Sequence, residues 1–158
     1  MIPLGYQVPV ILKKLAKIRT YYAQFPFVRR CAIQFGDPQG DNDIATIAQN
    51  LIAFVKAKMV YVPDPHGFEY TTAPDVMLAE ILQQGQTHGD CDDHVLLLNT
   101  LLCATGFQTA FVAVKLPPEG DLFDHVVTGV NLEGQWTLID PCAKTVIQPI
   151  YQSQLAIS

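Results

Sequence analysis

The sequence has few charged residues, few cysteines and no long apolar run. Only 16% of its 158 residues are charged and 49% are hydrophobic, which excludes an intrinsically disordered chain. Four cysteines are too few for a disulfide-stapled scaffold, and this length is sufficient for one ordinary hydrophobic core. Uncharged apolar runs such as Val95–Leu98 are too short to cross a bilayer, so we expect no membrane-spanning segment.

Targeting and nucleotide-binding signals are also missing. Lysines and arginines interrupt residues 1–25, so no apolar secretion signal is present and we expect a cytoplasmic protein. The sequence contains no glycine-rich phosphate loop and no recognition-helix motif, which argues against a nucleotide cofactor or a nucleic-acid partner. No residue pattern calls for any other cofactor.

Charge is distributed unevenly along the chain. Residues 1–36 hold six basic residues and no acid, whereas residues 37–158 carry a net charge of −11, which leaves −5 overall. Such asymmetry predicts a basic N-terminal arm over 1–36 and a separate folded domain over 37–158. We expect the arm to dock on an acidic surface, either of its own domain or of a second copy in a homo-oligomer, or to bind something anionic elsewhere.

Hydrophobic spacing predicts helices in the first two thirds of the chain. Residues 1–9 contain two prolines and a glycine and predict an extended lead-in. The predicted helices are a basic amphipathic helix over Val10–Tyr22, one capped by Asp43 and running to Lys58, one over Pro74–Gln84 and a buried, leucine-rich one over Cys91–Thr105. The proline-rich stretch at 61–67 predicts an ordered loop.

Strand patterns dominate the last third. The predicted strands cover Phe107–Leu116, Asp124–Leu132, Gln135–Ile139 and Thr145–Ile150, with a tight hairpin at Glu133-Gly134. Helices first and antiparallel strands afterwards indicate an α+β domain.

The densest polar cluster, Gly89-Asp90-Cys91-Asp92-Asp93-His94, opens the buried helix. A cysteine at a helix N-terminus feels the positive end of the helix dipole, which favours its thiolate. Its backbone N–H lacks a partner within the helix and can stabilise an oxyanion. Cys91 is therefore a candidate nucleophile.

A base and an orienting carboxylate follow in the strand region. His125 lies on an apolar strand, and Asp140 ends the next strand along the chain. Because the hairpin at 133–134 should pair these strands, the carboxylate can hold one nitrogen of the imidazole. Cys91, His125 and Asp140 form a candidate Cys-His-Asp triad.

These blocks resemble transglutaminase-like domains. The resemblance rests on Gly-x-Cys-x-Asp opening a leucine-rich helix, on Asp124-His125 and on Trp136-Thr137-Leu138-Ile139-Asp140-Pro141, and it covers roughly residues 44–145. It implies a papain-like fold in which the helix carrying Cys91 at its N-terminus packs on an antiparallel sheet. The block Tyr61-Val62-Pro63-Asp64-Pro65 is also similar to small members encoded in phage and prophage genomes. This chain differs in having Val126-Val127 where an aromatic residue commonly follows the histidine.

The resemblance implies cysteine-dependent acyl transfer on the amide carbonyl of a peptide or protein. Hydrolysis by a cysteine peptidase or amidase is the leading hypothesis. One alternative is a transglutaminase that crosslinks glutamine to lysine. The other is a non-enzymatic binding or assembly module of a phage or prophage particle.

Four further residues are assigned supporting roles. We expect Asp93 to stabilise the helix start and fix the loop around the site, and Asp124 to add negative charge beside His125. Trp136 is expected to pack on the His–Asp strand pair and shield it from water. Gln86 is the candidate second oxyanion donor, with Gln84 and His88 also open. The acidic surroundings favour a thiolate–imidazolium pair over a free thiolate.

The cysteines and histidines near the cluster have other interpretations. His88, Cys91 and His94 are three residues apart, so they do not converge well, and no CxxC pair accompanies them, which argues against zinc. Cys103 is most simply a core residue. Cys142 lies two residues after Asp140, where a disulfide with Cys91 is conceivable, and Cys31 has no evident role.

Overall fold

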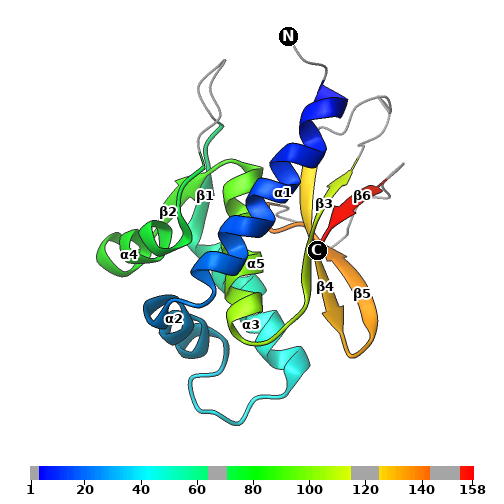
Figure 1. The fold of residues 1–158 in the computed structure, drawn as a ribbon. Coiled ribbons are helices and arrows are strands. Elements are labelled where there is room, and N and C mark those ends of the chain that lie inside the picture. Colours follow the sequence, from blue (N-terminus) through cyan, green and yellow to red (C-terminus); the bar gives the residue numbers. More distant parts are fainter. Residues whose placement is uncertain (1–3, 64–70, 115–124, 143–153) are drawn as a thin grey trace.

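The computed structural model describes residues 4–63, 71–114, 125–142 and 154–158 (Figure 1). The described helices are α1 (Leu4–Tyr22), α2 (Pro26–Gly36), α3 (Ile44–Lys58), α4 (Pro74–Gln84) and α5 (Cys91–Ala104). The described strands are β1 (Met59–Tyr61), β2 (Thr87–Gly89), β3 (Thr109–Val114), β4 (His125–Leu132), β5 (Gln135–Ile139) and β6 (Gln154–Ile157). The protein is an α+β structure, as predicted.

An antiparallel sheet forms one side of the molecule, in the strand order β5-β4-β3-β6. The hairpin between β4 and β5 turns at Glu133-Gly134 and pairs Thr128 with Ile139. That register sets the residue following β5 beside the beginning of β4. The short strands β1 and β2 form a separate parallel pair. Sequence analysis did not predict β1, β2 or β6, and the strand expected over Thr145–Ile150 lies outside the described residues.

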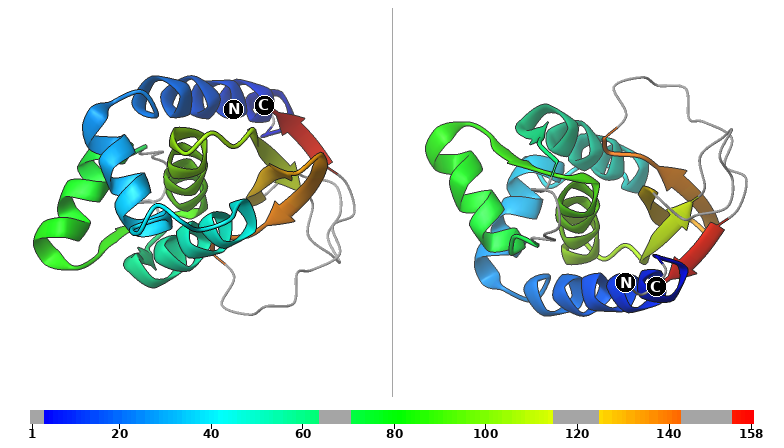
Figure 2. Two further views of the ribbon diagram at one scale, coloured as in Figure 1. Left: turned by 90° about the horizontal axis from the view of Figure 1, so that it is seen from below. Right: turned by 90° about the horizontal axis from the view of Figure 1, so that it is seen from above.

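Helix α5 is the centre of the core. Five of its leucines are completely buried (Leu96, Leu97, Leu98, Leu101 and Leu102). Figure 2 shows α1 and α3 on opposite sides of α5 and the sheet on a third side. Burial on nearly all sides explains why this helix lacks a polar stripe, as predicted from its leucine content.

The N-terminal region contradicts one expectation and extends another. The extended lead-in over 1–9 is wrong for its described part, since α1 begins at Leu4 and contains Pro9. Val8, Leu12 and Leu15 form a buried stripe along α1, so tertiary packing outweighs the breaker residues. Sequence analysis also missed α2, although its buried Val28, Cys31 and Ala32 have helical spacing after Pro26 at the first position.

Helices α1 and α2 belong to the same hydrophobic core as α5. Leu12, Leu15, Val28 and Ala32 cluster with the leucines of α5 and with side chains of the sheet. Arg19 is buried in the same region and donates through Nη1 to the carbonyl oxygen and the hydroxyl of Thr109, at 3.0 and 3.1 Å. The division into an arm over 1–36 and a domain over 37–158 stays a prediction. Among the described residues, no helix is long and apolar enough to span a membrane.

Candidate active site

The start of α5 is built from the Gly89–Asp93 motif. The Asp90 side chain accepts a hydrogen bond from the Asp93 backbone N–H at 3.2 Å, and the Asp93 carboxylate accepts one from the Asp90 N–H at 3.3 Å. This reciprocal capping box satisfies two donors of the first turn. It also fixes Cys91 as the first helical residue, where its backbone N–H has no acceptor within the helix.

Asp93 also ties a neighbouring segment to the helix. Its side chain is buried, and its second oxygen accepts the backbone N–H of Thr72 at 3.1 Å. A Cβ on Gly89 would lie 2.5 Å from Cβ and Oδ2 of Asp93, so only glycine leaves room for the folded-back carboxylate. The Gly-x-Cys-x-Asp motif is therefore one structural unit, and Asp93 takes the loop-fixing position that the sequence predicted for it.

The structure brings His125 and Asp140 into direct contact. His125 opens β4, Asp140 follows β5, and Nε2 of His125 lies 2.6 Å from Oδ2 of Asp140. The other carboxylate oxygen accepts the backbone N–H of Cys142 at 2.9 Å. The two side chains are only 16% and 9% exposed, so the pair is shielded from bulk water. The carboxylate thereby orients the ring and leaves Nδ1 available on its opposite edge.

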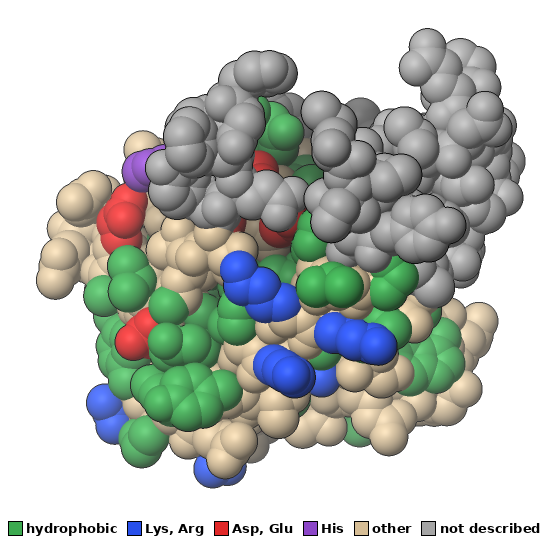
Figure 3. Space-filling view, turned by 45° about the horizontal axis from the view of Figure 1, so that its top comes forward, with side chains coloured by type: hydrophobic (Ala, Val, Ile, Leu, Met, Phe, Trp, Pro, Cys, Tyr) green, Lys and Arg blue, Asp and Glu red, His purple; other side chains and the backbone are tan. Residues whose placement is uncertain are grey.

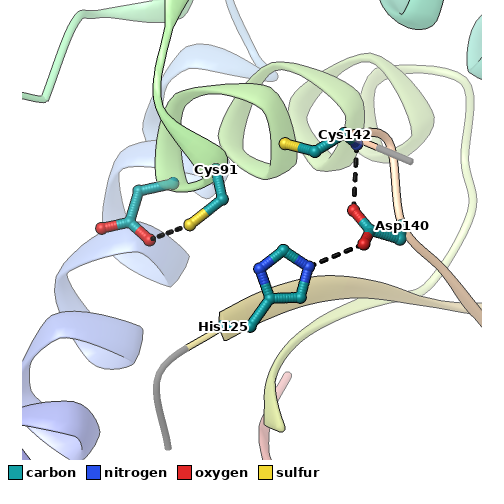
Figure 4. Close-up of polar contacts among 5 residues, drawn as sticks. Cys91, His125, Asp140 and Cys142 are labelled. Carbon is teal, nitrogen blue, oxygen red and sulfur yellow. Dashed lines mark hydrogen bonds and ion pairs between the residues drawn. The ribbon is translucent and has the colours of Figure 1, made fainter. Parts of the chain in front are cut away.

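Cys91 lies on that opposite edge. In Figure 4, the sulfur of Cys91 and the carboxylate of Asp140 flank the imidazole of His125 from opposite sides, so that Nδ1 is directed to the side of the sulfur. The sulfur is contributed by α5, whereas the ring and the carboxylate come from the paired strands β4 and β5. Three segments distant in sequence thus converge on one site.

The charge around Cys91 works against its thiolate. Burial raises the pKa of Cys91 most, and the negative charges of Asp92 and Asp90 raise it further, to about 12, despite a hydrogen bond from the Val126 backbone N–H that lowers it. The Sγ–H donates to Oδ1 of Asp92 over 3.8 Å. The expected resting thiolate–imidazolium pair is therefore wrong, because burial first, and then the nearby acids, oppose a charged sulfur.

In contrast to Cys91, Asp140 has a pKa that is shifted toward its charged form. Burial by itself raises the pKa of its carboxyl, but the hydrogen bond and charge of His125, the Cys142 N–H and the charge of Lys56 outweigh it, and the net pKa is lowered. A carboxylate ionised at neutral pH is the form that accepts the ring N–H and stabilises an imidazolium. The pKa of the nearby Cys142 thiol is raised by burial, then by the charges of Asp140 and Cys91.

Of the predicted supporting residues, Trp136 lies away from this site. Trp136 pairs with Asn131 near the turn of the β4–β5 hairpin and is 49% exposed, so it does not shield the triad. Gln86 is exposed and precedes β2, and its role as the second oxyanion donor stays a prediction. The Trp136 prediction inferred proximity from sequence distance alone. Asp124 lies outside the described residues.

The histidines of the rejected zinc interpretation have other partners. His88 is exposed and lies 3.4 Å from Glu80, and Nδ1 of the buried His94 lies 2.7 Å from the carbonyl oxygen of Asp90. In the segments that the structure describes, no three His, Cys, Asp or Glu side chains are grouped to hold a metal ion.

Other contributors to the site were not found from sequence. They are the backbone N–H groups of Val126, Cys142 and Thr72 and the distant charge of Lys56 on α3. Backbone donors have no residue-type signal, and the approach of Lys56 to Asp140 depends on how α3 packs. Only the spacing of Cys142 from Asp140 pointed to a neighbour of the site, and Figure 4 places Cys142 there.

No protein-family model matches the chain, and no curated protein sequence matches it. Two solved bacterial structures are similar in fold. One is a "putative cysteine protease" of Cytophaga hutchinsonii, with a TM-score of 0.56 and 14% identity over 77% of this chain and 38% of its own. The other is a "putative protease" of Parabacteroides distasonis, with a TM-score of 0.58 and 15% identity over 79% of this chain and 25% of its own. This chain therefore spans well under half of either protein, and the likeness is one of fold.

Proposed function

We propose that this chain is a papain-like cysteine peptidase or amidase of the transglutaminase-like type, with Cys91 as nucleophile, His125 as base and Asp140 as orienter. The observation that carries the proposal is the 2.6 Å contact between His125 and Asp140, which directs the free ring nitrogen to the side of Cys91. The fold likeness to two proteins named as proteases supports it.

The chemistry follows from the geometry and charge of the site. Since the pKa of Cys91 is about 12, the resting group is a thiol, and Nδ1 of His125 removes its proton as the sulfur attacks the amide carbonyl. The oxygen of the tetrahedral intermediate accepts the backbone N–H of Cys91. The amine leaves with the proton from His125, and a thioester remains. Water, deprotonated by the same ring, then releases the carboxylic acid and restores the thiol.

Covalent labelling tests the proposal directly. We expect a chloroacetamide-capped dipeptide to add once to the protein, at Cys91, as mapped by mass spectrometry. The Cys103→Ala variant should label within about twofold of the parent, and His125→Ala at least about 100-fold more slowly, because general-base assistance is lost. An adduct at Cys103 with none at Cys91 would refute the assignment.

The charge of the same site also favours a lysine amine, in place of water, as the acceptor of the acyl group. Asp92 lies 3.8 Å from the sulfur of Cys91 and would attract the ammonium group of a lysine, which favours the crosslinking alternative. A glutamine-containing peptide incubated with and without a fluorescent primary amine separates the two reactions. Formation of a new carboxylate on the peptide, at the same rate in both samples, supports hydrolysis, whereas incorporation of the amine supports crosslinking. The alternative of a non-enzymatic binding or assembly module stays a prediction. A partner that binds in fixed stoichiometry, with an affinity unchanged by Cys91→Ala, would favour it.

A further inference from the structure

The outward side of α1 is a basic surface with apolar groups between its cations. Lys13, Lys14 and Lys17 are all exposed, and so are Val10 and Tyr21, at 67% and 60%. We call this the α1 face. Figure 3 shows Lys and Arg side chains gathered on this side of the molecule, with Asp and Glu side chains of the described residues above and to the left of them.

The lysines of the α1 face are not used to hold the fold together. Where both partners belong to the described residues, no Lys or Arg is within ion-pair distance of an Asp or Glu, and the ion pairs are His88 with Glu80 and His125 with Asp140. Arg19 has the opposite role, since its hydrogen bonds to Thr109 anchor α1 on β3. This anchor turns the apolar stripe inward and the lysines outward. Three cations are thus held close together and left to solvent.

Two adjoining surface hollows run along the α1 face. One, of about 400 Å³, is lined by Val10, Lys13, Lys14, Lys17 and Ile18. The other, of about 460 Å³, shares Lys17 and extends past Tyr21 to Gln24 and Ser158. The first hollow combines apolar walls with three ammonium groups, and the second adds the ring of Tyr21 beside Lys17. This lining matches a segment presenting both apolar and carboxylate side chains.

We propose that the α1 face binds an acidic, partly apolar polypeptide segment and recruits substrates that carry one. The recruitment of a substrate rests on the proposed function, whereas binding of the segment does not. Such a segment would be repelled at the site itself, where Asp90 and Asp92 lie beside Cys91. The structure therefore favours a bipartite substrate, whose acidic part lies on α1 and whose cleaved part is neutral or basic.

Other anionic occupants fit less well. Nucleic acids and anionic bilayers present dense negative charge to the whole molecule, whose net charge is −5, and leave Val10 and Tyr21 without apolar partners. A second copy placed symmetrically on the same face would bring the lysines of both copies together. A short acidic peptide avoids both conflicts.

The test measures peptide binding to the full chain carrying Cys91→Ala, so that turnover cannot consume the ligand. The probe is a fluorescent peptide that alternates Glu with Leu, and its control replaces each Glu by Gln. At about 0.15 M salt we expect the Glu peptide to bind at least about tenfold more tightly than the Gln peptide, and the difference to shrink toward 1 M salt.

Matched charge reversals locate the binding. Lys13→Glu with Lys17→Glu should weaken the Glu peptide at least about tenfold, while Arg29→Glu with Arg30→Glu, which alters two exposed arginines of α2, should change it by about twofold or less. Equal losses in both pairs, or equal binding of the two peptides, would overturn the proposal. So would tighter binding to duplex DNA or to phosphatidylserine vesicles, or a dimer that the lysine reversals dissociate.

Failure of this proposal is distinguishable from failure of the proposed function. With Cys91 intact, the lysine reversals should leave labelling by the small chloroacetamide dipeptide within about twofold, because that probe lacks an acidic segment for the α1 face to bind. Unlabelled Cys91 in the parent protein refutes the catalytic assignment. Normal labelling without peptide binding refutes only the role of the α1 face.

Discussion

The two ends of α5 each carry a cysteine, yet their surroundings differ completely. At the N-terminal end, Cys91 faces His125 and Asp140 and is flanked by further carboxylates. At the C-terminal end, Cys103 lines a hollow of about 560 Å³ whose lining includes Arg29 and Asp37 but no histidine. The comparison teaches that a cysteine and its helix are not sufficient for a candidate active site. Of the two ends of α5, only the N-terminal one meets a histidine and a carboxylate from β4 and β5.

The two ends of α5 are also capped in different ways. Asp90 and Asp93 cap the first turn with side chains. At the last turn, the N–H of Gly106 bonds to the Cys103 carbonyl at 3.0 Å and the N–H of Phe107 to the Leu102 carbonyl at 3.0 Å, a Schellman arrangement with Gly106 at φ 99°. The N-terminal end uses charged groups that also border the site, whereas the C-terminal end uses backbone N–H groups and the uncharged hydroxyl of Thr105, which donates to the Leu101 and Leu102 carbonyls.

The largest expected effect comes from removing the charge of the orienting residue. Asp140→Asn should lower the rate of Cys91 labelling and amide turnover about 1,000-fold, because the ring loses the carboxylate that sets its tautomer and stabilises its charged form. Cys142→Ala is the matched control, since Cys142 holds Asp140 through its backbone N–H, and it should stay within about threefold. Equal rates in the two variants would mean that Asp140 does not act on the reaction.

The same carboxyl group predicts a pH dependence of stability. Its pKa in the folded protein is lowered, so its contribution is complete above the unfolded value of about 3.9 and is lost as the pH falls through the folded value. The difference in free energy of unfolding between the parent and Asp140→Asn should therefore be constant near neutral pH and shrink below about pH 4. Urea unfolding across this range measures it.

An intermediate effect distinguishes the two glycines that border α5. Gly89→Ala should lower the free energy of unfolding by about 3 kcal/mol, because the new Cβ displaces the Asp93 carboxylate and breaks its bonds to two backbone donors. Gly106→Ala meets no atom within 4 Å and should cost only about 1 kcal/mol, from its left-handed backbone. Urea unfolding of both variants gives the comparison.

Substitution by asparagine separates the steric collision of a Cβ from the cost of a left-handed backbone conformation. Asparagine adopts the left-handed region more readily than alanine, so Gly106→Asn should recover part of the stability that Gly106→Ala loses. Gly89→Asn should recover nothing, since any Cβ collides with Asp93. If asparagine rescues position 89 as well, the close approach of Asp93 is not the reason for glycine there.

The sequence predicted the parts of the structure that depend on local pattern. The helices α3, α4 and α5 and the β4–β5 hairpin were confirmed because caps, apolar spacing and the turn at 133–134 all agree there. The hairpin register then implied that His125 and Asp140 would be neighbours. Motif order and pairing were thus sufficient to select the residues that now meet.

The errors came from properties that only the packed chain determines. Pro9 and Gly5 indicated a break in α1, but burial of Leu12 and Leu15 outweighs it. Trp136 was assigned to the site by its distance in sequence from Asp140, whereas the hairpin carries it toward the turn. The resting ion pair was wrong because burial of the Cys91 sulfur, the largest cause of its raised pKa, cannot be read from the sequence.

The smallest expected effect concerns the charge of Asp92 beside Cys91. It tests whether this acid at the N-terminal end of α5 lowers the reactivity of the cysteine. Asp92 raises the pKa of Cys91 both by its charge and by accepting a hydrogen bond from the thiol. Asp92→Asn should lower that pKa, so alkylation of Cys91 by iodoacetamide at pH about 8 should become about threefold faster and its pH profile should move to lower pH. Asp75→Asn on α4 removes a distant carboxylate and should change neither. A profile unmoved by Asp92→Asn would leave burial as the cause of the high pKa, and Asp92 would then serve acceptor binding or the helix start.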